Sequence, residues 1–434
     1  MTCFRHRDRL RTLSAAFAFA LTAAPLASQQ PSYPTRWSPA IAERADVKAA
    51  LEYLDKRFPK QLEEWARITE MQAKSEHEKM RADYVYGVME DEGLKVSYDS
   101  IGNVTGIREG TGGGPTIVFA AHMDIVHALG TDLKVRFDGD TLRAPGVFDN
   151  SASVANLLAV IRAMRIGNVK TKATFIFVAT VQEELGLKGM DWWLDHNPKP
   201  DLLVGMDGGL GPIMYGALGI YWSKYVFTGA GSHTVTSRGK PTPVKAVADA
   251  IAHIYQVNVP PLPQGAVYNV GQIHGGVIFN GIPQELYYTM DLRSPDPVLL
   301  DSLDRTLDGI AAAAAKKEGV QWHKEIVQHN KAGGTTATLA GARAHPIVQT
   351  AIDIHHSLGI DIGPPGKDAE AFGSTDANMG VVRGIPSIAV GRSFGGNQHT
   401  ITEWAHWPSA LPATKMILLL AVALSDGAVK GIVP

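Results

Sequence analysis

The sequence predicts an α/β fold, in which a sheet is flanked by helices, with a smaller α+β module inserted into the chain. Short apolar runs rich in β-branched residues are typical of buried strands, and they occur at residues 116–121, 173–181 and 202–206. After residue 207 the predicted order becomes strand, helix, strand, strand, helix, strand, which describes a compact α+β unit. A chain of 434 residues also exceeds the size at which one core keeps growing, so we expect two domains.

The other elements follow from helical and alternating apolar periodicities. The larger domain begins with helices over residues 43–67 and 76–92, a strand over 94–98 and a helix over 153–164. The module has strands at 219–228, 267–273, 285–292 and 321–328, and helices at 244–255 and 297–317. A helix at 346–358, a strand at 387–390 and a helix at 411–425 complete the larger domain. The predicted division is therefore 40–215 and 335–434 for the larger domain and 216–334 for the module.

Residues 1–28 have the pattern of a secretory signal peptide. Arginines between Arg5 and Arg11 precede an apolar run at 13–21, and small residues follow. The run is too short for a comfortable membrane span, although an uncleaved or membrane-anchoring terminus stays open as the alternative. We expect an exported protein, periplasmic or secreted. Since the single cysteine, Cys3, lies in this segment, thiol catalysis and disulfides are excluded for the mature chain.

The charge balance argues against nucleic acid as a partner. The formal net charge is −2, and without the first thirty residues 37 basic face 42 acidic side chains, so no basic stripe remains. The longest apolar run of the closing helix, residues 416–424, is too short to cross a bilayer. We therefore expect this helix to belong to the core and predict no stable membrane span.

Acidic residues and a histidine follow the predicted buried strands. His122 follows the first strand, Glu183 and Glu184 the second, and Asp207 the third, while Asp149 lies in a turn. Ligands of open α/β sheets collect beyond the carboxyl ends of the strands, and imidazole and carboxylate groups suit a zinc-like ion. A single acidic residue is more often a solvated surface group, so the prediction of a metal site depends on their joint placement.

Five motifs carry a resemblance to a known family, and they lie in its order at comparable spacing. They are His122-x-Asp124, Asp149-Asn150, Glu183-Glu184-x-Gly186, Asp207 and His399-Thr400-x-x-Glu403. From about residue 45 onward the chain resembles the di-zinc exopeptidases and amidohydrolases that include aminoacylase, carboxypeptidase G, acetylornithine deacetylase and peptidase T. The resemblance implies a zinc-exopeptidase-like catalytic domain, a mixed sheet flanked by helices, with an inserted α+β lid or dimerisation domain.

The resemblance also implies roles for these residues, with two Zn²⁺ as cofactors and Co²⁺ or Mn²⁺ as substitutes. One ion would lie on His122 and Asp207 and the other on Glu184 and His399, with Asp149 bridging both. Glu183 would be the general base, and Asp124 would support His122 as a ligand. The family further implies a cis peptide bond between Asp149 and Asn150. Such a pair of ions, roughly 3.5–4 Å apart, lowers the pKa of water toward ~7, and Glu183 would pass its proton to the departing amine.

Three residues of the inserted module match the family's lid. His233 corresponds to a histidine that helps to hold the substrate carbonyl and often reaches across to the partner subunit, and Asn280 and Arg293 match the lid asparagine and arginine. An arginine can clamp a substrate carboxylate bidentately. The alternatives are a surface arginine and a turn histidine. The family lid often forms the dimer contact, so a homodimer through the lid is expected as one option.

We therefore expect an exported di-zinc metallohydrolase that cleaves an amide bond in small peptides as an exopeptidase. Deacylation of N-acyl amino acids is the alternative within the family. The loop at 391–396 differs from the Gly-Pro-Gly of many deacylases and is closer to the peptidase T branch, and His127 stands where proline is frequent. A signal peptide with two domains also fits a periplasmic solute-binding protein, but that alternative gives no reason for Glu183 beside Glu184.

Overall fold

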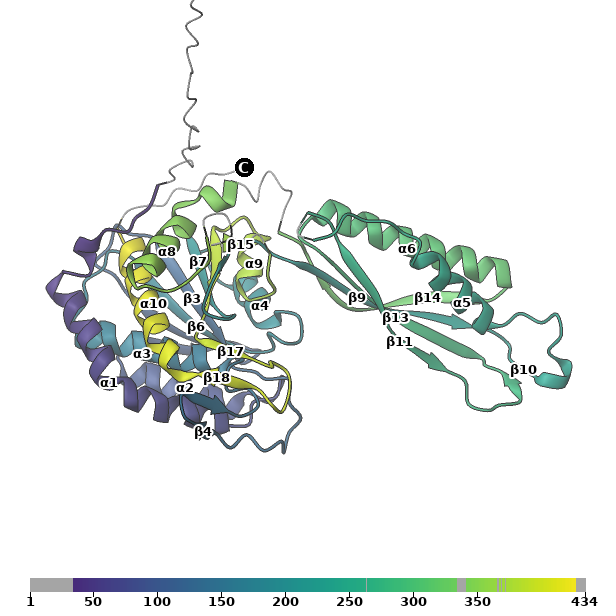
Figure 1. The fold of residues 1–434 in the computed structure, drawn as a ribbon, viewed down its shortest axis with the longest axis horizontal. Helices are drawn as coiled ribbons and strands as arrows, with labels where there is room; N and C mark the ends of the chain where they lie inside the picture. Colours follow the sequence, from purple (N-terminus) through teal and green to yellow (C-terminus); the bar gives the residue numbers. More distant parts are fainter. Residues whose placement is uncertain are drawn as a thin grey trace, which may run out of the picture. The chain divides into compact units, whose positions relative to one another are not determined.

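The main sheet of the computed structural model is mixed and carries helices on both faces (Figure 1). The structure describes residues 34–426, except 263, 334–340, 365–366, 368 and 371. Within them the sheet has the order β1-β2-β6-β3-β7-β16-β8-β15. Its strands are β1 (Lys95–Tyr98), β2 (Val104–Arg108), β3 (Thr116–His122), β6 (Thr174–Thr180), β7 (Leu202–Met206), β8 (Ile213–Met214), β15 (Ala369–Glu370) and β16 (Ser387–Val390). The α/β class and the mixed sheet are confirmed.

The four central strands are parallel, which aligns their carboxyl ends. β3 pairs in parallel with β6 and with β7, and β7 pairs in parallel with β16. His122 at the end of β3 is level with Thr180 at the end of β6. The predicted strands at 116–121, 173–181, 202–206 and 387–390 are therefore confirmed, and their ends meet at one edge of the sheet.

The central strands are apolar along their whole length because helices cover both faces of the sheet. Ile117 and Phe119 of β3 belong to the core formed with α1, α3 and α10, whereas Val118 and Ala120 pack on the opposite face. The helices of the first face are α1 (Ala45–Glu70), α2 (Lys79–Asp91), α3 (Ser151–Ile166), α8 (Pro346–Ser357) and α10 (Ala410–Leu424). Those of the second face are α4 (Lys188–His196) and α9 (Ala377–Val381).

The closing helix is a core element. By length and composition alone, the segment Trp407–Leu424 could cross a membrane, but 72% of it is buried inside the fold. It packs against α3 and α8. Within the described part of the chain it is the one candidate of this kind, and its burial supports the expectation that it is not a membrane span.

A second sheet, with its own core, contains the residues predicted for the inserted module. Its strand order is β11-β13-β9-β14, all antiparallel, and Tyr225, Phe227 and Tyr288 pack against leucines of its long helix. Its elements are β9 (Gly219–Thr228), α5 (Pro243–Ile254), β11 (Val267–Gly275), β13 (Glu285–Ser294), α6 (Pro297–Glu318) and β14 (Gln321–Asn330). The predicted element order is thus confirmed. The domain boundaries at 215/216 and 334/335 remain a prediction, and the second of them lies outside the described residues.

Several short elements are absent from the sequence prediction. The sequence prediction missed β2 because Gly106 interrupts its alternation of apolar and polar residues. Glycine suits this position, since a Cβ atom there would lie only 2.8 Å from the side chains of Leu94 and Met89. The predicted loop before His399 contains a strand, β17 (Phe394–Gly396), which pairs with β18 (Trp404–His406). With β4 (Arg136–Asp138) and β5 (Thr141–Arg143) these form a small four-stranded sheet. Strands of three residues are too short to show a period.

The predicted signal peptide at 1–28, including Cys3, lies outside the described residues, so its export role remains a prediction.

Candidate metal centre and active site

The carboxyl ends of the parallel strands bring the predicted residues together. His122 ends β3, and Asp207 directly follows β7. Glu183 and Glu184 follow the second strand, as predicted. β6 ends at Thr180, and a turn with Gln182 in the left-handed region, at φ 53°, carries both glutamates. This turn therefore sets the backbone position of both glutamates.

The first ligand group consists of His122, Asp149 and Asp207, whose side-chain ligand atoms lie within 4.8 Å of one another. His122 Nε2 is 3.2 Å from Asp149 Oδ1 and 3.9 Å from Asp207 Oδ2. The histidine is buried and the two carboxylates are nearly so. An imidazole facing two carboxylates is a donor set that suits a divalent cation.

The second ligand group consists of Asp149, Glu184 and His399 and meets the same distance limit. His399 Nε2 lies 3.4 Å from Asp149 Oδ2 and 3.1 Å from Glu184 Oε1. His399 reaches the site from a loop 277 positions after His122 in the numbering, and its φ of 64° is uncommon for a residue other than glycine. Asp149 thus presents Oδ1 to His122 and Oδ2 to His399.

The chemistry of the donor atoms tests whether these groups fit a pair of cations. Asp149 Oδ1 and Glu184 Oε1 are buried and accept no well-aligned hydrogen bond from the described residues. Their nearest partners are nitrogens at ion-pair distance: Arg392 Nη2 and His122 Nε2 for the first oxygen and His399 Nε2 for the second. Imidazole and carboxylate donors around such buried oxygens suit divalent ions, so the residues fit two of them, with Asp149 shared by both groups. The predicted cis peptide between Asp149 and Asn150 is also present.

Glu183 lies beside both groups and forms a third possible ligand group with His122 and Glu184. Its Oε2 is 4.0 Å from His122 Nε2, and its side chain is 8% exposed. Burial raises the pKa of Glu183 well above its usual range; His122 opposes this shift, and Asp207 adds to it. A buried carboxyl group with a raised pKa is suited to take up and release a proton during catalysis.

Asp124 supports the turn that carries the two glutamates. It is fully buried and accepts hydrogen bonds from Ser75 Oγ at 2.7 Å and from the backbone N–H groups of Glu183 and Glu184 at 3.0 and 3.2 Å. Its Oδ1 is 3.4 Å from His122 Nδ1, while its own carbonyl oxygen is slightly closer, at 3.2 Å. Asp124 therefore touches the imidazole, as predicted, and also fixes the backbone of both glutamates.

Glu403 is a residue whose role the sequence reasoning missed. Its buried carboxylate accepts hydrogen bonds from the backbone N–H groups of Gly146, Phe148 and Asp149 at 3.0, 2.8 and 2.7 Å. These residues form the turn that presents Asp149 to both ligand groups. The spacing His399-x-x-x-Glu403 was the available signal, since it places the acid near the metal-site loop.

Arg392 is the second residue that was missed. Its guanidinium, 1% exposed, pairs with Asp207 through Nη1 and lies 3.1 Å from Asp149 Oδ1 through Nη2. Burial lowers the pKa of Arg392, but Asp149 and Asp207 raise it above its usual value. The available signal was its position two residues after β16, since that strand neighbours the strand that Asp207 follows.

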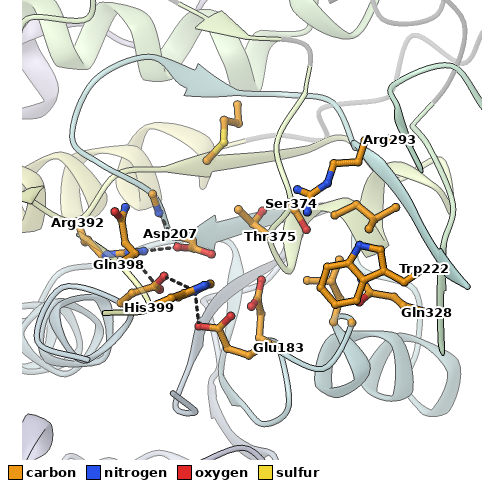
Figure 2. Close-up of a pocket in the computed structure, with 17 residues that line it drawn as sticks. Glu183, Asp207, Trp222, Arg293, Gln328, Ser374, Thr375, Arg392, Gln398 and His399 are labelled. Atoms are coloured by element: carbon orange, nitrogen blue, oxygen red, sulfur yellow. Dashed lines mark hydrogen bonds and ion pairs between the residues drawn. The ribbon is translucent and has the colours of Figure 1, made fainter. Parts of the chain in front are cut away.

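A cavity of about 300 Å³ opens beside the two ligand groups (Figure 2). Trp222, Gln328 and Arg293 lie on the side opposite Arg392 and His399, and Ser374 and Thr375 lie between the two sides. Arg293 is thus at the cavity, as predicted, where its guanidinium pairs with Asp291 at 3.0 Å. A cavity of this size holds a small ligand.

The other two predicted lid residues do not line this cavity. His233 and Asn280 lie together in a separate cavity of about 730 Å³, with Asn280 Nδ2 3.3 Å from His233 Nε2. Within this one chain they are therefore not brought to the ligand groups. Their predicted contact with substrate, within one chain or across to a partner subunit, remains a prediction.

Residues 118–423 match the model of peptidase family M20/M25/M40. Among curated relatives, the uncharacterized protein YqjE of Bacillus subtilis is 23% identical over 75% of this chain and 88% of its own length. The N-acetyl-L-cysteine deacetylase of the same organism is 28% identical over a shorter stretch, 33% of this chain and 35% of its own length.

Solved structures share the fold over nearly their whole length. A tripeptidase from Staphylococcus aureus has a TM-score of 0.69 at 18% identity, covering 85% of this chain and 98% of that one. The Bacillus subtilis protein YxeP, described as a dinuclear metal binding peptidase, has a TM-score of 0.61 at 16% identity, covering 86% and 99%.

Proposed function

This chain belongs to peptidase family M20/M25/M40, and from that membership we propose that it is a di-zinc exopeptidase acting on small peptides. The observation that carries the proposal is the pair of ligand groups that share Asp149, with Glu183 beside them at 4.0 Å from His122 Nε2. YxeP, a structural neighbour, is a dinuclear metal binding peptidase by description, which supports two ions. The choice of zinc follows from the histidine and carboxylate donor set.

The chain's own residues supply the acid and base chemistry. When bound, two divalent cations polarise the amide carbonyl and lower the pKa of water. Glu183 takes one proton from the attacking water and delivers it to the nitrogen of the departing amine, so that the amide becomes a carboxylic acid and a free amine. The acid then releases the second proton of the water to solvent, which leaves a carboxylate. Asp124 holds Glu183 by its backbone N–H, and burial keeps the carboxyl group able to carry this proton.

The cavity supports action at the end of a short substrate. Arg293 and Gln328 face the ligand groups across about 300 Å³, and an arginine fork binds a free carboxylate bidentately. A terminal carboxylate of a dipeptide or tripeptide would compete with Asp291 for this guanidinium. The tripeptidase neighbour is consistent with such a substrate.

Deacylation of an N-acyl amino acid is the second candidate. The local similarity to an N-acetyl-L-cysteine deacetylase favours it, and the same Arg293 would hold the carboxylate of the amino acid. The chemistry at Glu183 is identical, since both reactions break an amide bond.

Export and dimerisation belong to the proposal as well. The pattern of residues 1–28 supports export to the periplasm or medium. The loop beside His233 and Asn280 exposes Val277, Ile278 and Phe279, and an apolar patch of this kind supports a homodimer through the lid.

The decisive experiment is hydrolysis by the zinc-loaded protein of matched substrates. The panel contains dipeptides, tripeptides, the same peptides with a C-terminal amide, and N-acetyl amino acids. We expect cleavage of free peptides and a loss of kcat/KM when the C-terminal carboxylate is blocked. Cleavage of N-acetyl amino acids alone would favour the deacylase, and no hydrolysis of any member would refute the proposal.

Replacement of the proposed base separates catalysis from metal binding. Glu183→Ala should lower kcat by about 10²–10⁴-fold, the usual contribution of a general base, while two ions per chain remain bound. The matched control is Glu63→Ala, because Glu63 is an exposed acid on α1 and its loss should leave kcat unchanged. Full activity of Glu183→Ala would remove this residue as the base.

A further inference from the structure

Arg392 places a fixed positive charge against the first ligand group. Its Nη1 pairs with Asp207 Oδ1, and its Nη2 is 3.1 Å from Asp149 Oδ1. The latter oxygen is also the one that faces His122 Nε2 at 3.2 Å. The guanidinium and a cation held by the first group would therefore share the same carboxylate oxygen.

The guanidinium is held in this position by the fold. Val390, at the end of β16, is level with Met206 on β7, and the N–H of Arg392 donates to Gly208 O at 3.2 Å. The carbonyl oxygen of Arg392 accepts from Asn156 Nδ2 at 2.9 Å. The guanidinium also lies over the ring of Phe148, 4.1 Å from its centre. Arg392 is thus an integral part of the site.

The second ligand group uses different atoms. His399 faces Asp149 Oδ2 and Glu184 Oε1, and neither oxygen takes part in the ion pairs of Arg392. Each group contains one histidine and two carboxylates, so the ligand types alone would give the two groups similar affinity for a cation. Arg392 makes them different, because the ion pairs of its guanidinium involve carboxylate oxygens of the first group. Like charges repel most strongly where water is excluded, and the first group bears this repulsion directly.

We propose that Arg392 is a built-in counter-ion that holds Asp149 and Asp207 in the metal-free protein and weakens cation binding by the first ligand group. A buried carboxylate without a counter-charge is costly, and Arg392 provides that charge before any metal arrives. The second ligand group consequently loads first, and the ion of the first group is the exchangeable one. The proposal rests on the proposed function in one respect, namely that the chain binds two divalent ions.

Calorimetric titration of chelator-treated protein with ZnCl₂, with metal counted by mass spectrometry, tests the proposal. The wild type should bind two ions in steps that differ at least tenfold in Kd. Arg392→Gln, which removes the charge, should tighten the weaker step at least tenfold, whereas Arg392→Lys, which keeps it, should not. His399→Ala should retain only the weaker step. The proposal would be overturned if the weaker binding step had the same or a higher Kd in Arg392→Gln than in the wild type. Retention of the tighter binding step in His399→Ala would also overturn it.

Thermal unfolding provides an independent readout. Metal-free Arg392→Gln should melt several degrees below the metal-free wild type, and zinc should remove most of that difference. The matched control is Arg162→Gln, because Arg162 pairs with Glu64 and neither residue belongs to a ligand group. This control substitution should lower Tm equally with and without metal. Equal losses in both forms of Arg392→Gln would contradict the counter-ion role.

The titration distinguishes a failure of the proposed function from a failure of the proposed role of Arg392. If the wild type binds no zinc, the proposed function fails; if it binds two ions and Arg392→Gln behaves identically, only the present inference fails. Should metal-free Arg392→Gln not fold, the zinc-loaded variant is challenged with a chelator instead. Slower release of one ion than in the wild type is then expected, and equal or faster release overturns the proposal.

Discussion

At the scale of single residues, the site depends on buried acids that bind backbone N–H groups. Glu403 binds three such groups around Asp149, and Asp124 binds those of Glu183 and Glu184. Neither acid belongs to a ligand group, yet each fixes residues that do. Partners of this kind orient metal ligands and typically contribute 10–100-fold to affinity or activity.

Glu403→Gln should therefore lower zinc affinity and kcat/KM by about 10–100-fold. The amide has only one acceptor oxygen, so it cannot satisfy the three N–H groups that both carboxylate oxygens now bind. Metal titration and steady-state kinetics measure the effect, with Glu63→Gln as the exposed control. Wild-type zinc affinity in Glu403→Gln would show that the turn at Asp149 is held by other contacts.

The sequence predicted the residues that follow strands, and the family resemblance added Asp124, but the supporting roles of Arg392 and Glu403 were not predicted. His122 and Asp207 could be predicted because apolar runs mark where β3 and β7 end. Arg392 and Glu403 could not, because their roles arise from pairings that no local pattern encodes: Arg392 through the β7–β16 pair, and Glu403 through a contact across 254 positions with Asp149.

At the scale of elements, α8 contains a buried histidine that makes stability depend on pH. His355 is fully buried, and its Nδ1 contacts Ala351 O at 2.7 Å. Burial lowers the pKa of His355 to about 4. Below pH ~6.5 the unfolded chain takes up a proton that the folded chain refuses, so the stability contributed by this residue falls as the pH decreases from about 6.5 to about 4.

His355→Leu should reduce this acid sensitivity by about 2 kcal/mol between pH 7 and pH 5, because that interval crosses only part of the range between the two pKa values. The measurement is the free energy of unfolding in urea at pH 7 and pH 5, in chelated protein so that metal loss does not contribute. The neighbouring His356 is exposed, and His356→Leu should retain the wild-type pH dependence. An identical slope in His355→Leu and the wild type would mean that His355 is protonated in the folded state.

Long elements were predictable because they carry full periods, as α6 and β9 do. The short strands β17 and β18 were not, although they frame the loop that carries His399. The family motif contains His399, so the resemblance predicted this residue. It did not predict β17 and β18, because strands of three residues are too short to show a period.

At the scale of the whole molecule, two sheets with separate cores serve different parts of the proposed function. The main sheet and the loops at its strand ends supply the ligand groups except for His399, which comes from the loop between β17 and β18 of the small sheet. The second sheet supplies Trp222, Arg293 and Gln328 to the cavity. The proposed function therefore assigns chemistry and substrate choice to different parts of the chain.

This division predicts that Arg293→Ala changes substrate binding and leaves the metal centre intact. KM for a peptide with a free C-terminus should rise by about tenfold or more, because a bidentate, charge-assisted contact is lost. Zinc stoichiometry should remain two per chain. A KM that is unchanged for free peptides would exclude Arg293 as the carboxylate partner.

An anomalous difference map from a crystal of the zinc-loaded protein would show most directly whether two zinc ions share Asp149. Two peaks are expected, one among His122, Asp149 and Asp207 and one among Asp149, Glu184 and His399, roughly 3.5–4 Å apart. A map with no peak at Asp149, or with zinc only at other histidines, would contradict this expectation.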